Sequence, residues 1–258
     1  MIYNINPAVD NSPLIAWDNL IPAATITATT GDETALLNGV TTDPWVPTAM
    51  PATVSIDAGA GVTASTFCIA AHNLGSVGAT VTLERLVGAV WTQVQQITPA
   101  DDSPLIMSFS PISAQEWRAV FSGATAPRVA VMSLGPGLIV PGRIIPPHIP
   151  LHRASEVNLV GDSESGTGEF LQADFERTGG RVSLNFSVQL PDFAAGDDFE
   201  AFRQHFNRGR SFFMACFPEH EPLDVGYLWR SKRGSNILAP YQDAVFMSFG
   251  IEASLYVG

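Results

Sequence analysis

The sequence predicts a mainly β protein in two parts, an N-terminal β-sandwich or jelly roll followed by a β-rich domain with one amphipathic helix. Up to about residue 134, short apolar and β-branched segments alternate with turn residues roughly every eight to twelve positions, as in sandwiches. No convincing amphipathic helix occurs before residue 190. A Pro- and Gly-rich stretch, residues 135–152, then separates the two parts.

The chain opens with a predicted docking arm, residues 1–16. It contains Pro7 and Pro13, and its apolar residues are sufficient to dock it onto either its own domain or a neighbouring subunit. The sandwich is expected over residues 17–134. Its centre is predicted to be an antiparallel pair, residues 53–57 and 66–72, joined through a turn at Asp57-Ala58-Gly59. The second of these strands is apolar enough to be buried on both faces.

Further strands of the sandwich are predicted from β-branched content and flanking turns. An ordered loop with Trp45 as its large anchor precedes the central pair. The predicted strands are Thr25–Thr29, Ala79–Leu86, Ala89–Ile97, Leu105–Phe109, Gln115–Phe121 and Arg128–Leu134.

Residues 135–152 cannot continue a central strand because prolines remove ladder donors, so we expect a semi-extended linker. The domain at 153–258 should contain one helix near 197–208. Phe199, Phe202 and Phe206 share a face of this helix, Asp197 and Glu200 resemble a capping box, and Gly209 closes it. The strands predicted around it are 156–160, 169–176, 181–190, 211–217, 225–229 and 244–257.

Composition limits the classes of function. Charged residues make up 15% of the chain, which suits either a subunit covered by neighbours or a soluble Thr/Ser/Ala-rich β surface. The net charge of −12 argues against nucleic-acid binding, and we read Arg230–Arg233 as a hairpin tip. No apolar run is long enough to span a membrane, so we expect synthesis in the cytosol. Cys68 and Cys216 should be buried thiols, with neither a disulfide nor a zinc site.

The sequence predicts no catalytic, cofactor-binding or metal-binding residues, and leaves ligand-binding residues unknown. His72 follows a buried strand and should bond to the backbone, whereas His220 should lie at a loop tip. His148 and His152 are four residues apart, but Pro147 and Pro150 exclude the helix that would pair them on a metal. The fifth histidine, His205, shows no metal-ligand spacing to the others.

Two further groups of residues could be imagined as sites. Glu164 and Glu169 have the residue types of a glycosidase pair, but a solvated hairpin is the better interpretation. Trp17, Trp45 and Trp91 could stack on sugars, although we expect core packing instead.

A set of residues in the first half resembles the discoidin-type (coagulation factor C-domain) jelly roll. These are Trp45, the step Ile56-Asp57-Ala58-Gly59, residues 67–73, Trp91 and Trp117-Arg118. The resemblance covers residues 17–135 and implies a sandwich. Calcium or sugar binding cannot be carried over to named positions, because the loops differ and no terminal disulfide is present.

The segment Ile-Ala-Ala-His-Asn-Leu-Gly at 69–75, followed by the linker and a mixed β domain, looks more like phage tail proteins. This resemblance implies a non-enzymatic subunit of a phage tail tip or baseplate. Such a subunit would form a symmetric ring, with a hexamer favoured, through its arm, linker and C-terminal domain, together with other tail proteins. It would be assembled in the host cytoplasm and carried in the virion. The alternative is a carbohydrate-binding module for adsorption to a host-surface glycan.

Overall fold

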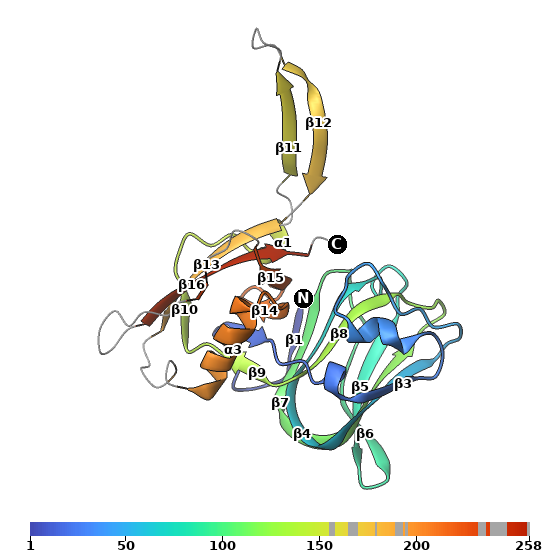
Figure 1. Ribbon diagram of the computed structural model, residues 1–258. Helices are drawn as coiled ribbons and strands as arrows, with labels where there is room; N and C mark the ends of the chain where they lie inside the picture. The colour runs from blue at the N-terminus through green and yellow to red at the C-terminus, as the bar shows by residue number, and fades with distance from the viewer. Residues whose placement is uncertain are drawn as a thin grey trace.

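Two long, bent strands organise the first half of the protein in the computed structural model (Figure 1). They are β4 (Ala52–His72) and β7 (Leu105–Ser122), which pair antiparallel along most of their length. The structure describes residues 1–154, 158–164, 170–178, 180–188, 193, 196–231, 236–237 and 247–256. Side chains of 158–164, 170–178 and 247 are outside this description.

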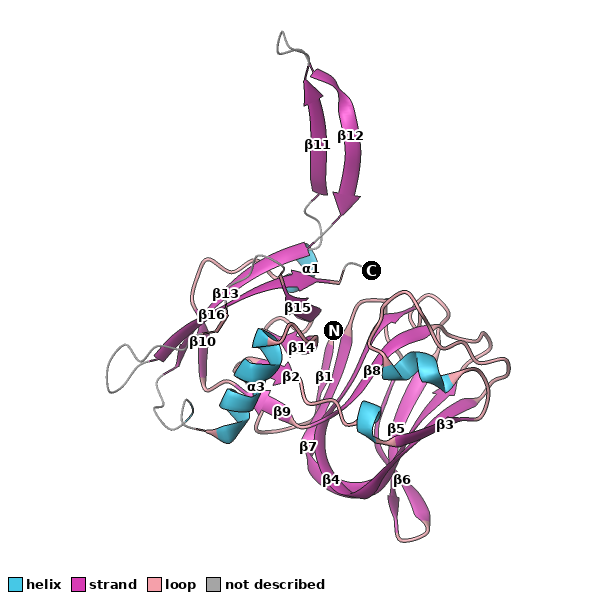
Figure 2. Ribbon diagram, in the orientation of Figure 1, coloured by secondary structure: helices cyan, strands magenta, loops and turns pink. Residues whose placement is uncertain are grey.

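The remaining elements complete two seven-stranded sheets and one separate hairpin (Figure 2). In the first half they are β1 (Ile2–Asn4), β2 (Leu14–Ala16), η1 (Ile21–Ala23), β3 (Thr25–Ala28), η2 (Glu33–Leu37), β5 (Thr80–Val87), β6 (Val90–Ile97) and β8 (Val129–Gly135). In the second half they are β9 (Gly137–Ile139), β10 (Gly142–Ile144), α1 (Leu151–Ala154), β11 (Asn158–Glu164), β12 (Phe170–Thr178), β13 (Gly180–Val188), α3 (Asp197–Asn207), β14 (Phe212–Ala215), β15 (Val225–Arg230) and β16 (Met247–Leu255).

The bend in β4 and β7 lets one continuous sheet form both layers of the sandwich. The N-terminal part of β4 pairs with β3, while its C-terminal part pairs with β8, and register shifts after Asp57 and Ala64 separate the two parts. The predicted turn at Asp57-Ala58-Gly59 is therefore wrong. Gly59 has a φ of +72°, but the chain bulges there and continues in the same strand instead of reversing.

The sandwich core fills the space between these layers. Trp45 and Trp117 are among its largest members, exposed by 1% and 0%, and Trp45 Nε1 donates to the carbonyl of Thr30 at 2.9 Å. Residues 66–72 are buried throughout, which confirms the prediction of a strand buried on both faces. The mainly β fold with a sandwich is likewise confirmed.

The second sheet has the order β10-β13-β16-β15-β14-β2-β9. Residues 135–152 are thus more than a linker, because β9 and β10 are its two outermost strands. Their position explains how a proline-rich segment joins a sheet, since an edge strand needs ladder bonds on one side only. The predicted helix is confirmed as α3, and Phe199, Phe202 and Phe206 are buried in the core of this half.

The start of α3 differs from the prediction. Its N-cap is Gly196 and no side chain caps the helix, so the expected Asp197–Glu200 capping box does not form. Glu200 instead makes two 2.7 Å bonds to Arg203. Gly209, at φ +76°, follows the helix end as expected.

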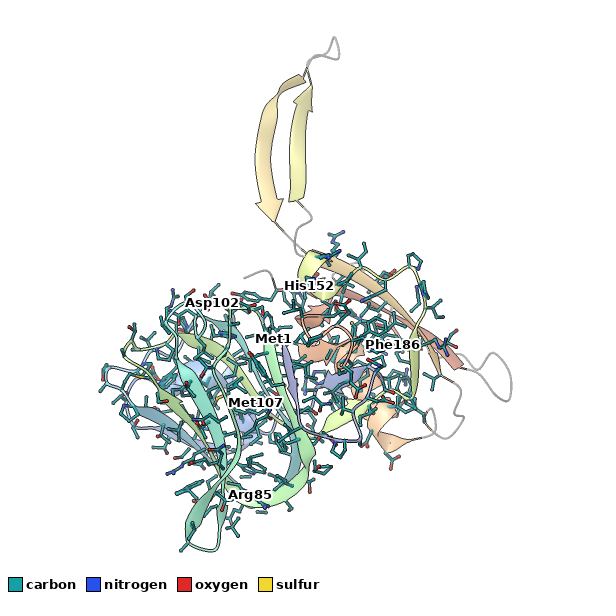
Figure 3. All side chains as sticks on the ribbon, turned by 180° about the vertical axis from the view of Figure 1, so that it is seen from behind. Met1, Arg85, Asp102, Met107, His152 and Phe186 are labelled. Carbon is teal, nitrogen blue, oxygen red and sulfur yellow. The ribbon has the colours of Figure 1, made fainter. Side chains whose placement is uncertain are left out.

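The predicted docking arm is part of its own chain. β1 pairs parallel with β7 in the sandwich, and β2 inserts between β14 and β9 in the second sheet. A third apolar cluster joins the two halves and includes Leu14, Cys68, Ala70 and Phe213. Figure 3 places Met1 between the halves, with Met107 in the sandwich and Phe186 in the second half. The halves are consequently packed together and are not merely tethered by a spacer.

β11 and β12 form a hairpin that stands away from both sheets (Figure 1). They pair antiparallel with each other, from Asn158↔Thr178 to Glu164↔Phe170, and form their own two-stranded sheet. No helix in the described part of the chain is long and apolar enough to cross a membrane.

Candidate functional site

A cleft of about 690 Å³ lies between the two halves of the protein. Its walls come from the segment after β2, the loop after η2, strand β8, the end of α3, and strands β14 and β15. Aromatic side chains line one part of it: Trp17, Tyr227 and Trp229. Trp17 and Trp229 are both half-buried residues.

Hydrogen bonds hold the cleft wall in place. The Tyr227 hydroxyl bonds to the carbonyl of Gly39 at 2.9 Å and to Ser211 Oγ at 2.7 Å, which ties the η2 loop to the second sheet. Burial raises the pKa of Tyr227, so this hydroxyl stays protonated at neutral pH. Trp17 rests edge-on against His205, with ring centroids 5.4 Å apart.

The ionisable groups of the cleft come from distant parts of the chain. His205 Nε2 lies 2.8 Å from the Ser211 carbonyl, so one ring nitrogen is committed to the backbone. Burial lowers the pKa of His205, and the hydrogen bond to the Ser211 carbonyl, followed by the charge of Asp18, offsets part of that effect. Asp18 is half-buried and Arg210 is exposed. The cleft therefore offers aromatic faces, one carboxylate and one guanidinium to a bound molecule.

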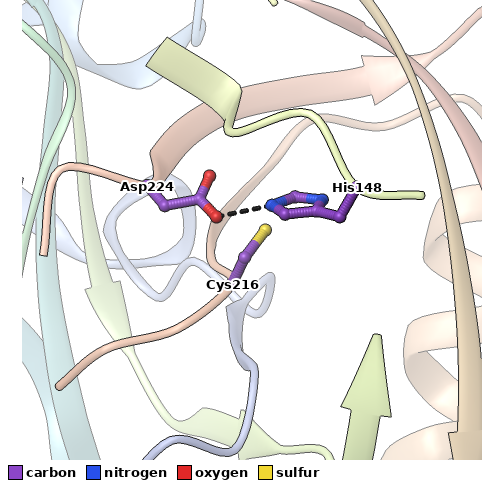
Figure 4. Close-up of side chains that lie close together, drawn as sticks. All are labelled: His148, Cys216 and Asp224. Atoms are coloured by element: carbon purple, nitrogen blue, oxygen red, sulfur yellow. Dashed lines mark hydrogen bonds and ion pairs between the residues drawn. The ribbon is translucent and has the colours of Figure 1, made fainter. Parts of the chain in front are cut away.

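A second group of chemically active side chains lies deeper in the second half (Figure 4). His148 Nε2 is 2.6 Å from Asp224 Oδ2, and Cys216 points toward the same carboxylate. The other oxygen of Asp224 accepts the Leu151 N–H at 2.6 Å. Burial first, and then the Asp224 carboxylate, raises the pKa of the Cys216 thiol well above its usual range. The thiol is consequently protonated at neutral pH.

The other residues that the sequence suggested for chemistry are dispersed. His72 bonds to the backbone as predicted, through Ser103 and Leu74, and His220 is exposed on a loop. Cys68 and Cys216 are both free and buried, which confirms the prediction of buried thiols. His152 lies in α1.

The remaining candidates offer little to a ligand. Trp45 is a core residue with no face for a sugar, and Trp91 is half-buried beneath Arg118, whose guanidinium carbon lies 4.3 Å from the ring centroid. The Glu164 and Glu169 pair, and Lys232 and Arg233 of the predicted hairpin tip, lie outside the described residues or side chains.

The cleft as a whole could not be found from the sequence. Trp17 is a candidate for stacking on sequence grounds, but Asp18, Tyr227 and Trp229 belong to segments about two hundred residues apart, and no local pattern links them. Asp224 escapes sequence reasoning too, because a single aspartate in a loop gives no signal until the fold places His148 and Cys216 beside it.

No protein-family model matches the chain, and no curated protein matches its sequence. Among solved structures, the chain is similar to chitosan-binding module 1 of a chitosanase/glucanase from Paenibacillus sp. IK-5, at 17% identity and TM-score 0.39, covering 45% of this chain and 98% of that one. It is also similar to the family 32 carbohydrate-binding module of C. perfringens NanJ, solved with galactose, at 20% identity and TM-score 0.39, covering 47% and 98%.

A third similarity is to SpGH29, at 17% identity and TM-score 0.39. It covers 46% of this chain and only 28% of that one. Two of the three neighbours are thus carbohydrate-binding modules, matched at low identity over less than half of this chain. None of the three is a phage protein, so the phage part of the resemblance gains no support from them.

Proposed function

We propose that the protein is a non-catalytic subunit of a protein assembly and that its β11–β12 hairpin binds a second copy of the chain. The projection of this hairpin carries the proposal. An isolated two-stranded hairpin is marginally stable in water, because it buries little apolar surface. The hairpin stands off the body (Figure 2), and within the described part of the chain its two strands pair with each other alone, so a neighbouring subunit would supply the missing contacts.

Charge indicates where the hairpin would bind. Its sequence is acidic and contains Asp162, Glu164, Glu169, Asp174 and Glu176 against a single Arg177. Arg208 and Arg210, at the end of α3, are both exposed, and neither forms an ion pair with another described residue. A hairpin-to-α3 contact joins two different surfaces, and repeating such a contact gives a ring when the rotation between neighbours closes.

The proposed ring is testable by charge reversal in the full chain. We expect multi-angle light scattering to show an oligomer for the wild type and a smaller species for Arg208→Glu/Arg210→Glu. Arg143→Glu, which also reverses an exposed arginine, should assemble normally. Mixing the α3 variant with Asp174→Lys/Glu176→Lys should restore the oligomer, because every hairpin-to-α3 contact between the two variants then joins opposite charges. A monomeric wild type at high concentration, or identical behaviour of all variants, would reject the hairpin contact.

The assembly that we propose is a phage tail tip or baseplate, made in the host cytoplasm and carried in the virion. The resemblance of residues 69–75 to tail proteins supports it. The arm no longer contributes, because β1 and β2 are used within the chain. Co-expression with tail proteins, followed by electron microscopy, tests the idea, and a ring of six copies is expected. Failure of this chain to enter any tail particle would argue against it.

Carbohydrate binding is a second candidate, favoured by the cleft between the halves. Apolar faces of sugar rings pack on indole, and carboxylate and guanidinium groups bond to their hydroxyls. A glycan array should then show binding that Trp229→Ala abolishes. Trp91→Ala is the matched control, because Trp91 is half-buried but not part of the cleft. No hits on the array, or equal loss in both variants, would exclude the cleft as a glycan site.

A further inference from the structure

Three different metal-ligating side chains meet in the second half of the protein. His148 belongs to the segment before α1, Cys216 directly follows β14, and Asp224 directly precedes β15. One ligand atom from each lies within 4.8 Å of the others (Figure 4). Imidazole nitrogen, thiolate sulfur and carboxylate oxygen are the three donor types that zinc takes in proteins.

Burial separates this group from an ordinary surface cluster. The side chains of Asp224 and His148 are 0% and 10% exposed, and Cys216 is 0% exposed. No Lys or Arg pairs with Asp224 among the described residues; its ion-pair partner there is His148. A buried carboxylate needs a compensating charge. Binding of a divalent cation would release the proton of the Cys216 thiol to solvent, and the cation with thiolate, carboxylate and neutral imidazole then gives a site with no net charge.

For the His148–Asp224 pair the geometry requires only a small adjustment. Ligand atoms at about 2.0 Å from a tetrahedral zinc are about 3.3 Å apart. His148 Nε2 and Asp224 Oδ2 are 2.6 Å apart, so they would separate by well under 1 Å. The Leu151 N–H fixes the other carboxylate oxygen, and the Phe217 ring lies edge-on to the imidazole at 5.3 Å. The hydrogen bond from Leu151 orients the carboxylate before a metal arrives, whereas His148 is held by the ring contact and by Asp224, and its Nδ1 has no hydrogen-bond partner among the described residues.

We propose that His148, Cys216 and Asp224 bind one Zn²⁺ ion, which fastens the segment leading to α1 onto the β14–β15 connection. This revises the sequence-based expectations that Cys216 forms no zinc site and that His148 is incidental. The site is independent of the proposed assembly role, because none of the three residues belongs to the hairpin or to the α3 arginines.

Cobalt(II) substitution tests the proposal directly, since a thiolate bound to cobalt gives a strong near-ultraviolet charge-transfer band. The full chain is stripped with a chelator, dialysed and titrated with Co²⁺ and then Zn²⁺. We expect the band to saturate at one equivalent and to be lost when Zn²⁺ displaces cobalt. Cys216→Ser should abolish it, and Cys68→Ser should retain it, because Cys68 is an equally buried thiol outside the cluster.

Two further measurements guard against a folding artefact. His148→Gln keeps the thiol and should weaken Zn²⁺ binding at least tenfold, as judged by competition with a chelating dye. Zn²⁺ should also raise the melting temperature of the wild type but not that of His148→Gln, because a ligand stabilises only the state that it binds. Absence of the thiolate band in the wild type, or an unchanged band in Cys216→Ser, would overturn the proposal.

Discussion

His72 is a buried polar residue whose two ring nitrogens both face backbone groups, and its ionisation shows the cost of that arrangement. His72 is 7% exposed, its Nδ1 accepts the Leu74 N–H at 3.2 Å, and its Nε2 lies 3.0 Å from the Ser103 carbonyl. A neutral imidazole with its proton on Nε2 fits both contacts. Burial lowers the pKa of His72 to about 4, although the hydrogen bond to the Ser103 carbonyl, and then Asp102 and Asp101, partly oppose the effect.

We therefore predict that His72 makes stability fall on acidification. The unfolded imidazole takes up a proton near pH 6.5 and the folded one near pH 4, so the stabilisation is present above pH 6.5 and is lost between these values. The loss is about 3 kcal/mol. Urea unfolding of wild type and His72→Asn at pH 7 and pH 4.5 measures it, and the wild type should lose more. If the wild type and His72→Asn lost the same unfolding free energy between the two pH values, His72 would not be the group responsible.

Gly31 is predicted to tolerate no side chain. Its φ is +83°, and a Cβ there would lie 2.7 Å from Trp45 Nε1 and from the Val46 carbonyl oxygen. Gly78 has a similar φ of +63° with open space around it. Gly78→Ala should cost about 1–2 kcal/mol from backbone strain alone, and Gly31→Ala clearly more. Equal unfolding free energies for the two variants would show that the contact with Trp45 relaxes freely.

At the scale of elements, local patterns were predictable and long-range ones were not. The spacing of Phe199, Phe202 and Phe206 identified α3, because helix periodicity depends only on neighbours in the sequence. The same logic failed at Gly59, since a bulge within a bent strand and a turn between two strands have the same residue signature. The arm and the proline-rich segment joined sheets through partners that are distant in the sequence.

The packing of α3 gives a prediction at this scale. Phe202 is fully buried and contacts the rings of Trp17, Phe206 and Phe212. Phe202→Ala should destabilise the protein by about 3–5 kcal/mol, because it removes a buried ring and leaves a cavity. Gln204→Ala, on the exposed face of the same helix, should cost under about 0.5 kcal/mol. Chemical denaturation measures the free energy of unfolding of both variants. Similar losses in the two would contradict the packing of α3 onto the sheet through Phe202.

At the scale of the whole molecule, the two halves are held together by the apolar cluster between them more than by the segment that connects them in the sequence. Leu14, Cys68, Ala70 and Phe213 bring the sandwich and the second sheet into one contact surface. The cleft lies at the same boundary, so its shape depends on how the halves are held. Sequence patterns suggested two separate cores because each half has its own periodicity, whereas the surface they share has none.

We predict that the two halves unfold together. Calorimetry of the wild type should give a single transition, since residues of both halves share the third cluster. Ala70→Asp places a charge in that cluster. It should separate the single transition into two or strongly lower its melting temperature. Ala60→Asp, at an exposed position of the same strand, should leave it intact. Two well-resolved transitions in the wild type would show that the shared cluster does not couple the halves.

The position of the first sixteen residues also affects how the chain is made. β1 finds its partner only when β7 has been synthesised, and β2 has both its partners only when β9 and then β14 have emerged. β1 and β2 therefore complete their pairing only after strands far downstream in the sequence have emerged. Until then the nascent sandwich carries an uncovered apolar face, and a chaperone would have its best opportunity to act during that interval.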